Sequence, residues 1–347
     1  MGRTCGTAYD WLIVTPVTVR VPAKVNLQLS VGPRRDDGYH DLVTVFHAVS
    51  LFDEVTVRPA ERTSVRVTGQ DAASVPSNRA NLAARAARAL AASLRRREKS
   101  AVQIVIRKRI PVAAGLAGGS ADAAAALVAC NELWGAGLSQ AELREVGAGV
   151  GSDVPFALLG GTAVGQGRGE RLTAALVTGT YHWVLAFASG GLSTPEVYAA
   201  CDRLRAARAD AVEVAAGVAA GATPAAGTGA GTGPGPVAAS PALSTELMAA
   251  LRSGDPAAVG PLLSNDLQPA ALSLRPELRR ALAEGRELGA LGAVVSGSGP
   301  TCAFLAANAG HARELAVGLT SAGVCRGAVR VQGPAGGAAV VAAGGEL

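Results

Sequence analysis

The sequence predicts an α+β protein built as two lobes, and three observations support this class. The first third alternates apolar and polar residues as half-buried strands do, the middle holds an alanine-rich helical run, and the last third mixes strands and helices again. At 347 residues the chain is long enough for two domains of ordinary size, each with its own core.

In the first half, alternation predicts strands over residues 17–31, 42–59, 63–69 and 100–111. A helix is expected from Asn81, whose side chain can cap the first amides. A glycine-rich turn then leads into an alanine-rich helix with Ser120 and Asp122 near its start. Ser139 and Glu142 have the spacing of a capping box for the next helix.

In the second half, residues 181–189 are expected to form a strand, and the helix that follows has Pro195 in its first turn. Residues 217–241 are of low complexity, rich in alanine, glycine and proline, and are expected to be a disordered insertion. After it, the pattern predicts a helix over 276–290, a strand–glycine turn–strand unit over 291–307, then a helix and a final strand.

Composition argues against several classes of function. No apolar run is long enough to span a bilayer and no signal peptide is recognised, so we expect a cytoplasmic protein without a membrane partner. The five cysteines and four histidines are too scattered for a zinc site. The net charge of +5 comes with an arginine-rich bias and only 3% aromatic residues, which disfavours a nucleic-acid partner.

The segment IPVAAGLAGGSADAAAAL, residues 110–127, has the glycines of a phosphate-binding loop but no lysine after them. A helix N-terminus offers unpaired amides and a partial positive charge, which suit a phosphate without a lysine. A tight strand-to-helix turn that binds nothing is the alternative. The loop by itself therefore favours phosphate binding but does not exclude a turn that binds nothing.

Three other segments bear on this choice. PAKVNLQL places Lys24 and Asn26 at alternate positions of a strand, so both side chains point to one face. Only three lysines occur in the chain, which suggests a chemical role for Lys24. VGSDVPFALLGG sets Asp153 in a constrained turn before a proline, and VVSGSGPTCAF is a second glycine turn after a strand.

Taken together, PAKVNLQL, PVAAGLAGGSADAA and SGSGPTCAF occur in the order found in the GHMP kinase superfamily, which the chain resembles. The resemblance implies an N-terminal lobe like domain 2 of ribosomal protein S5, over residues 1–180, and a ferredoxin-like C-terminal lobe, over 181–347. It also implies that the middle loop holds the phosphates of ATP. Ala114 departs from the family, which more often has glycine there.

Further stretches, RRDDGYHDLVTVFHAVSLFDEVTV, GSDVPFALLGGTAVGQGRGERL and SNDLQPA, are similar to one branch of that superfamily. This branch uses ATP to phosphorylate the 2-hydroxyl of 4-diphosphocytidyl-2-C-methyl-D-erythritol in the non-mevalonate isoprenoid pathway. The resemblance implies ATP and Mg²⁺ as cofactors, a small cytidyl diphosphate substrate as partner, and a monomer or homodimer.

Carried onto this chain, the resemblance implies Asp153 as general base and Lys24 as the cation that stabilises the transferred charge. The substrate would be bound by Asn26, Tyr39, His40 and Tyr198, with Tyr39 and Tyr198 on either side of the base. The ATP phosphates would lie against Pro111, Gly115, Leu116, Gly118, Gly119 and Ser120. The second turn, Gly297, Ser298 and Gly299, would brace the site. Metal ligands stay unassigned, with Ser120 as a candidate and Asp122 nearby.

Three alternatives remain open from the sequence. Another GHMP kinase, of the homoserine or mevalonate type, would share the loop but should lack the DGYH segment. A catalytically silent ligand sensor of the same fold has no need of both Lys24 and Asp153. A basic nucleic-acid-binding protein is the third alternative, and the composition opposes it.

Overall fold

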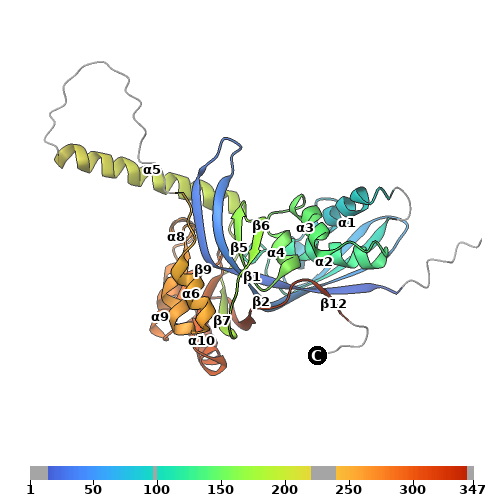
Figure 1. Cartoon of the computed structure of the whole chain (residues 1–347). Helices are drawn as coiled ribbons and strands as arrows, with labels where there is room; N and C mark the ends of the chain where they lie inside the picture. The colour runs from blue at the N-terminus through green and yellow to red at the C-terminus, as the bar shows by residue number, and fades with distance from the viewer. Residues whose placement is uncertain (1–14, 97–99, 220–239, 342–347) are drawn as a thin grey trace, which may run out of the picture.

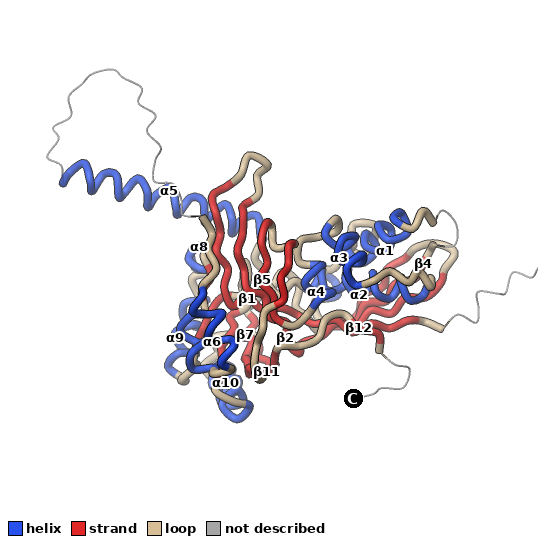
Figure 2. The backbone as a smooth tube through the Cα atoms, viewed as in Figure 1, coloured by secondary structure: helices blue, strands red, loops and turns tan. Residues whose placement is uncertain are grey.

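The computed structural model describes residues 15–96, 100–219 and 240–341. Two β-sheets form the frame, one in each half of the chain, and helices cover their outer sides (Figures 1 and 2). No helix of the described part is long and apolar enough to cross a membrane.

The first sheet is built on a long antiparallel pair, and its strand order is β12-β1-β2-β4-β3, with β5 and β6 extending from β2 and β8 added to β1. The register sets Lys24 opposite Ala48 and Asn26 opposite Phe46. Its strands are β1 (Val17–Arg34), β2 (His40–Pro59), β3 (Ser64–Gly69), β4 (Val102–Lys108), β5 (Thr162–Gly167), β6 (Arg171–Ala174), β8 (Ser264–Asn265) and β12 (Ala339–Val340).

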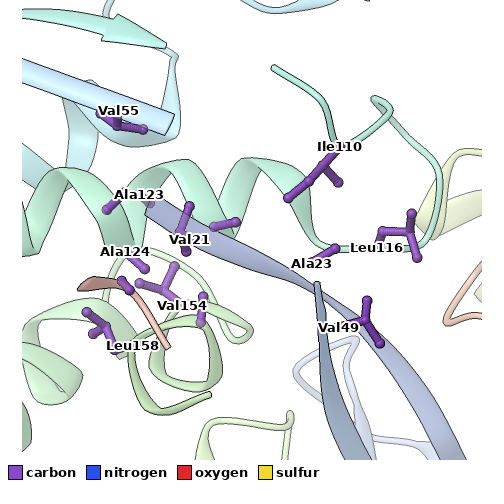
Figure 3. Close-up of a cluster of buried hydrophobic side chains, with 14 of the residues drawn as sticks. Val21, Ala23, Val49, Val55, Ile110, Leu116, Ala123, Ala124, Val154 and Leu158 are labelled. Atoms are coloured by element: carbon purple, nitrogen blue, oxygen red, sulfur yellow. The ribbon is translucent and has the colours of Figure 1, made fainter. Parts of the chain in front are cut away.

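Four helices pack on this sheet, and the alanine-rich α2 is buried at their centre. Alanine side chains let the α2 backbone approach the sheet closely, as Ala123 and Ala124 do beside Val21 of β1 (Figure 3). The predicted caps are present: Asn81 accepts from the amide of Ala83, and Ser139 and Glu142 form a capping box. These helices are α1 (Leu82–Ser93), α2 (Gly118–Leu133), α3 (Gln140–Ala148) and α4 (Val154–Leu159), and a 3₁₀ turn η1 (Ala72–Ser74) precedes them.

The second sheet is antiparallel with the order β11-β7-β10-β9. Its strands follow the chain as strand–helices–strand–strand–helix–strand, which is the ferredoxin-like arrangement that was predicted. The strands are β7 (Tyr181–Phe187), β9 (Gly292–Val295), β10 (Cys302–Ala306) and β11 (Gly327–Gly333). The helical elements are α5 (Thr194–Ala219), α6 (Thr245–Ser253), α7 (Pro256–Val259), η2 (Gly260–Leu262), α8 (Gln268–Leu274), α9 (Leu278–Glu287) and α10 (Ala309–Ser321).

Two features differ from a simple division of the chain at residue 180. The short strands β8 and β12 come from the second half but pair with β1 of the first sheet. The predicted disordered insertion over 217–241 is wrong at its start, because α5 continues to Ala219. Most of that segment lies outside the described residues.

Helix α5 runs beside the tip of the β1–β2 hairpin and extends beyond it (Figure 1). Arg205 of α5 donates to the carbonyls of Val31 and Gly32, and Asp202 contacts His40. The hairpin of the first lobe is therefore held by a helix of the second.

Candidate active site

A cavity of about 460 Å³ lies where the two lobes meet, bounded by β1, the glycine loop before α2 and the second glycine turn. Most of the residues predicted for the site line it. They are Lys24, Asn26, Pro111, Gly115, Gly118, Gly119, Ser120, Asp153, Tyr198, Gly297 and Ser298. Four predicted residues are not among the lining residues, namely Tyr39, His40, Leu116 and Gly299.

The glycine loop is held by its carbonyl groups. The carbonyls of Ala113 and Ala114 accept from the amides of Leu192 and Thr301 in the second lobe, both at 3.3 Å. The carbonyl of Gly115 accepts from Lys24 Nζ at 2.9 Å and from Ser296 Oγ at 3.1 Å. The next carbonyl, of Leu116, accepts from the Lys24 amide at 3.3 Å. Four successive carbonyls of the loop are thus hydrogen-bonded to β1 or to the second lobe.

Backbone conformation and packing explain why glycine is needed at one position of this loop. Gly115 has φ +76°, and a Cβ there would lie 2.1 Å from the carbonyl oxygen of Ser296. Ala113 and Ala117 also have positive φ, at 51° and 58°, whereas Ala114 does not. The departure from the family at Ala114 therefore introduces no left-handed strain.

Apolar residues anchor both ends of the loop. Ile110 is fully buried and Leu116 is 1% exposed, and both pack near Ala23 and Val49 (Figure 3). The Leu116 side chain belongs to the hydrophobic core, so the predicted contact of Leu116 with ATP can involve only its backbone. The loop is held at its ends by the hydrophobic effect and in its middle by hydrogen bonds.

Helix α2 begins at Gly118, two residues before the predicted start, and no side chain caps it. Ala117, the N-cap residue, has a left-handed conformation and no polar side chain to accept the first amides. The unpaired amides and the partial positive charge of the helix end are thus available beside the cavity. Such an end is suited to bind an anion.

Lys24 and Asn26 form a hydrogen-bonded pair on β1. Lys24 Nζ donates to Asn26 Oδ1 at 2.6 Å, and Asn26 Nδ2 donates to Thr44 Oγ1 at 2.8 Å. Both ends of the Asn26 amide are used by protein, so this side chain orients Lys24. Burial lowers the pKa of the Lys24 ammonium below its usual value, and attraction to Asp153 partly opposes that effect.

Asp153 stands at the N-terminus of α4, where a proline follows in the first helical turn. Its carboxylate does not cap the helix. In the described part of the chain it forms no ion pair within 4.0 Å, so its link to Lys24 is one of longer-range attraction. A carboxylate on a rigid turn is thus presented to the cavity.

The second glycine turn packs directly on Lys24. A Cβ on Gly297 would lie 2.9 Å from Lys24 Nζ, and φ at Gly297 is +55°. Asn265 holds this turn by donating to the carbonyls of Val295 and Gly297, both at 2.7 Å. Asn265 belongs to the SNDLQPA stretch, so one structural role of that stretch is to hold the second glycine turn.

The three aromatic residues predicted for the base are placed at the hairpin and on α5. His40 Nε2 contacts Asp202 Oδ1 at 2.9 Å, and the His40 ring packs at 5.0 Å from that of Tyr198. Tyr39 is 54% exposed, and its ring faces the guanidinium of Arg168. In this structure the Tyr39 and Tyr198 rings are therefore engaged by other protein groups.

A buried ion cluster behind the loop was missed from the sequence. Lys108 Nζ pairs with Asp53 and, at 2.8 Å, with Asp122. Burial raises the pKa of Asp122 to about 8, although Lys108 acts in the opposite direction. Asp122 Oδ1 is buried without a hydrogen-bond partner in the described part. The three residues lie far apart in the sequence, so no local pattern indicates their pairing.

The fold is that of a GHMP kinase. The description "GHMP kinases N terminal domain" matches residues 81–161, and "GHMP kinases C terminal" matches residues 247–325. A solved homoserine kinase from Cytophaga hutchinsonii, at 18% identity and a TM-score of 0.66 over 98% of this chain and all of the other, has the same fold.

Closer similarity is found with one kind of GHMP kinase. The chain is 53% identical to 4-diphosphocytidyl-2-C-methyl-D-erythritol kinase of Mycolicibacterium smegmatis, over 97% of this chain and 96% of the relative. A solved 4-(cytidine 5'-diphospho)-2C-methyl-D-erythritol kinase is 32% identical with a TM-score of 0.68, over 92% of this chain and all of the other. The chain belongs to the 4-diphosphocytidyl-2-C-methyl-D-erythritol kinase family.

The loop geometry predicts opposite results for two neighbouring substitutions. Gly115→Ala should raise the KM for ATP about tenfold or more, because it combines a left-handed φ with a clash against Ser296. Ala114→Gly should leave the KM for ATP nearly unchanged. Steady-state kinetics with varied ATP measure both, and an equal effect of the two substitutions would contradict the proposed role of Gly115.

Proposed function

We propose that the chain transfers the γ-phosphate of ATP to the 2-hydroxyl of 4-diphosphocytidyl-2-C-methyl-D-erythritol, a step of the non-mevalonate isoprenoid pathway. The observation that carries this proposal is the similarity to kinases of that name over nearly the whole chain. The cavity between the lobes supports it, because Lys24, Asp153 and the glycine loop line the same space.

The ATP phosphates are assigned to the N-terminus of α2. Its unpaired amides, from Gly118 to Ser120, take the part that a lysine plays in other phosphate loops. The adenosine end is assigned to the adjoining wall of the cavity, which is formed by Val75, Pro76 and Leu82. These side chains are largely apolar, as a binding site for a base requires.

Asp153 is assigned as the general base. Its carboxylate takes the proton of the substrate hydroxyl while the oxygen of that hydroxyl forms a bond to the γ-phosphorus and the bond to ADP breaks. Lys24 lowers the energy of the negative charge on these oxygens, and Asn26 holds Lys24 in place. Because phosphoryl transfer needs positioning and charge stabilisation, no covalent intermediate with the protein is required.

Mg²⁺ is expected to accompany the nucleotide. The described residues contain no group of three acidic, histidine or cysteine side chains that could hold a metal by itself. Nucleotide-bound Mg²⁺ takes most of its ligands from phosphates and water. Ser120 and Asp122 line the cavity, and Asp122 Oδ1 has no hydrogen-bond partner among the described residues, so the Ser120 hydroxyl and this oxygen fit as protein ligands. When bound, the ion neutralises phosphate charge.

A substrate panel tests the assignment. ADP release should occur with ATP, Mg²⁺ and 4-diphosphocytidyl-2-C-methyl-D-erythritol, and not with mevalonate or homoserine. Asp153→Asn should lower kcat on the cytidyl substrate by roughly 10²–10⁴-fold, because the base is removed while the shape is kept. Binding of ATP to the variant, measured separately, controls for loss of folding.

Turnover of homoserine or mevalonate in place of the cytidyl substrate would contradict the proposed substrate and assign the chain the activity of another branch of the superfamily. Nucleotide binding without turnover of any of the three acceptors would support the silent sensor and reject the kinase mechanism for this chain.

The rate should also depend on the charge of Lys24. The ammonium is charged below its pKa, and burial lowers that pKa, so the rate should fall with rising pH sooner than for an ordinary lysine. In Lys24→Arg this alkaline decline should disappear, because arginine keeps its charge, whatever the overall rate. A pH profile of kcat with the same alkaline decline in both proteins would assign it to another group.

A further inference from the structure

The turn between β5 and β6, with the sequence GQGRGE, has no part in the mechanism above. Gly167 and Gly169 on either side of Arg168 have positive φ, at 73° and 103°. The Arg168 amide donates to Glu170 Oε2 at 2.7 Å, and the Gly169 amide donates to the carbonyl of Gln166 at 3.0 Å. This tight turn presents the Arg168 side chain, which lines the cavity.

The turn lies beside the hairpin that carries the predicted nucleoside contacts. Strand β5 pairs with the start of β2, where Gly167 is opposite Leu42, two residues after His40. The Arg168 guanidinium lies 5.2 Å from the centroid of the Tyr39 ring, a cation–π distance. Arg168 therefore both contacts the exposed Tyr39 ring and lines the cavity that Lys24 and Asp153 line.

Arg168 differs from the neighbouring cations in having no acidic partner. Among the residues that the structure describes, no carboxylate oxygen forms an ion pair with the Arg168 guanidinium within 4.0 Å, although Glu170 accepts from the Arg168 backbone amide. On the same side of the molecule, Arg35 pairs with Asp37 and Asp41, and Arg205 pairs with Asp266. The charge of Lys108 is matched by two buried carboxylates. Arg168 thus offers an unpaired guanidinium at the cavity.

We propose that Arg168 binds the diphosphate of the cytidyl substrate. This inference rests on the proposed function and adds a specificity residue to it. The substrate carries its diphosphate between the nucleoside and the alcohol that is phosphorylated. Arg168 lies beside Tyr39, a predicted nucleoside contact, and lines the same cavity as Asp153, the proposed base for the alcohol. A guanidinium presents a planar fork of donors that matches two phosphate oxygens.

Binding of CDP and of cytidine, measured by calorimetry, separates the diphosphate contact from the base contact. Arg168→Gln should weaken CDP binding about 10–100-fold, as expected for loss of a hydrogen bond to a charged group, and leave cytidine binding unchanged. Arg168→Lys should recover part of the loss, because a charge without the fork remains. Arg171→Gln is the matched control, since Arg171 is exposed on the same hairpin and does not line the cavity.

Steady-state kinetics give a second readout. In Arg168→Gln the KM for the cytidyl substrate should rise by a similar factor, while the KM for ATP and kcat change little. A structural effect through Tyr39 would instead weaken cytidine and CDP equally, and this result would overturn the proposal. Wild-type protein that binds neither cytidine nor CDP would reject the cytidyl function itself, and with it the role of Arg168.

Discussion

The hydrogen bonds to the carbonyls of the glycine loop are the constraint on which the site depends. From Ala113 to Leu116 each carbonyl is hydrogen-bonded to β1 or to the second lobe, and these contacts fix the orientation of the loop backbone. The same contacts join the lobes, because Leu192, Ser296 and Thr301 belong to the second one. The orientation of the loop and the contact between the lobes therefore depend on the same hydrogen bonds, and so does the helix end to which we assign the phosphates.

The positively charged groups near the loop differ in whether acidic side chains pair with them. Lys108 Nζ lies behind the loop, 3.1 Å from where a Cβ on Gly118 would be, but it is paired with the acidic side chains of Asp53 and Asp122. Lys24 instead contacts neutral oxygens and keeps a charge that reaches Asp153. The field at the cavity thus comes from the helix end, Lys24 and Arg168. In our proposals the helix end binds the ATP phosphates, Lys24 stabilises the transferred charge and Arg168 binds the diphosphate of the acceptor.

Features that depend on residues close together in the sequence could be predicted, and features that depend on tertiary contacts could not. The alternate spacing of Lys24 and Asn26, the glycines before α2 and the cap at Asn81 depend on a few neighbouring residues, and the structure has them as expected. The pairing of Lys108 with Asp53 and Asp122, and the place of Arg168 at the cavity, depend on contacts between segments that are apart in the sequence. The burial of the Leu116 side chain could not be predicted, because a loop pattern does not distinguish an apolar anchor from a side chain that faces the ligand.

The most direct measurement is a crystal structure with a non-hydrolysable ATP analogue bound. The phosphate oxygens should accept hydrogen bonds from backbone amides between Gly115 and Ser120, with the carbonyls of Ala113 to Leu116 still bound to their present partners. Lys108 should stay paired with Asp53 and Asp122. Phosphates held mainly by Lys108, or a loop whose carbonyls have turned to the cavity, would contradict the view that fixed backbone amides replace a lysine at this site.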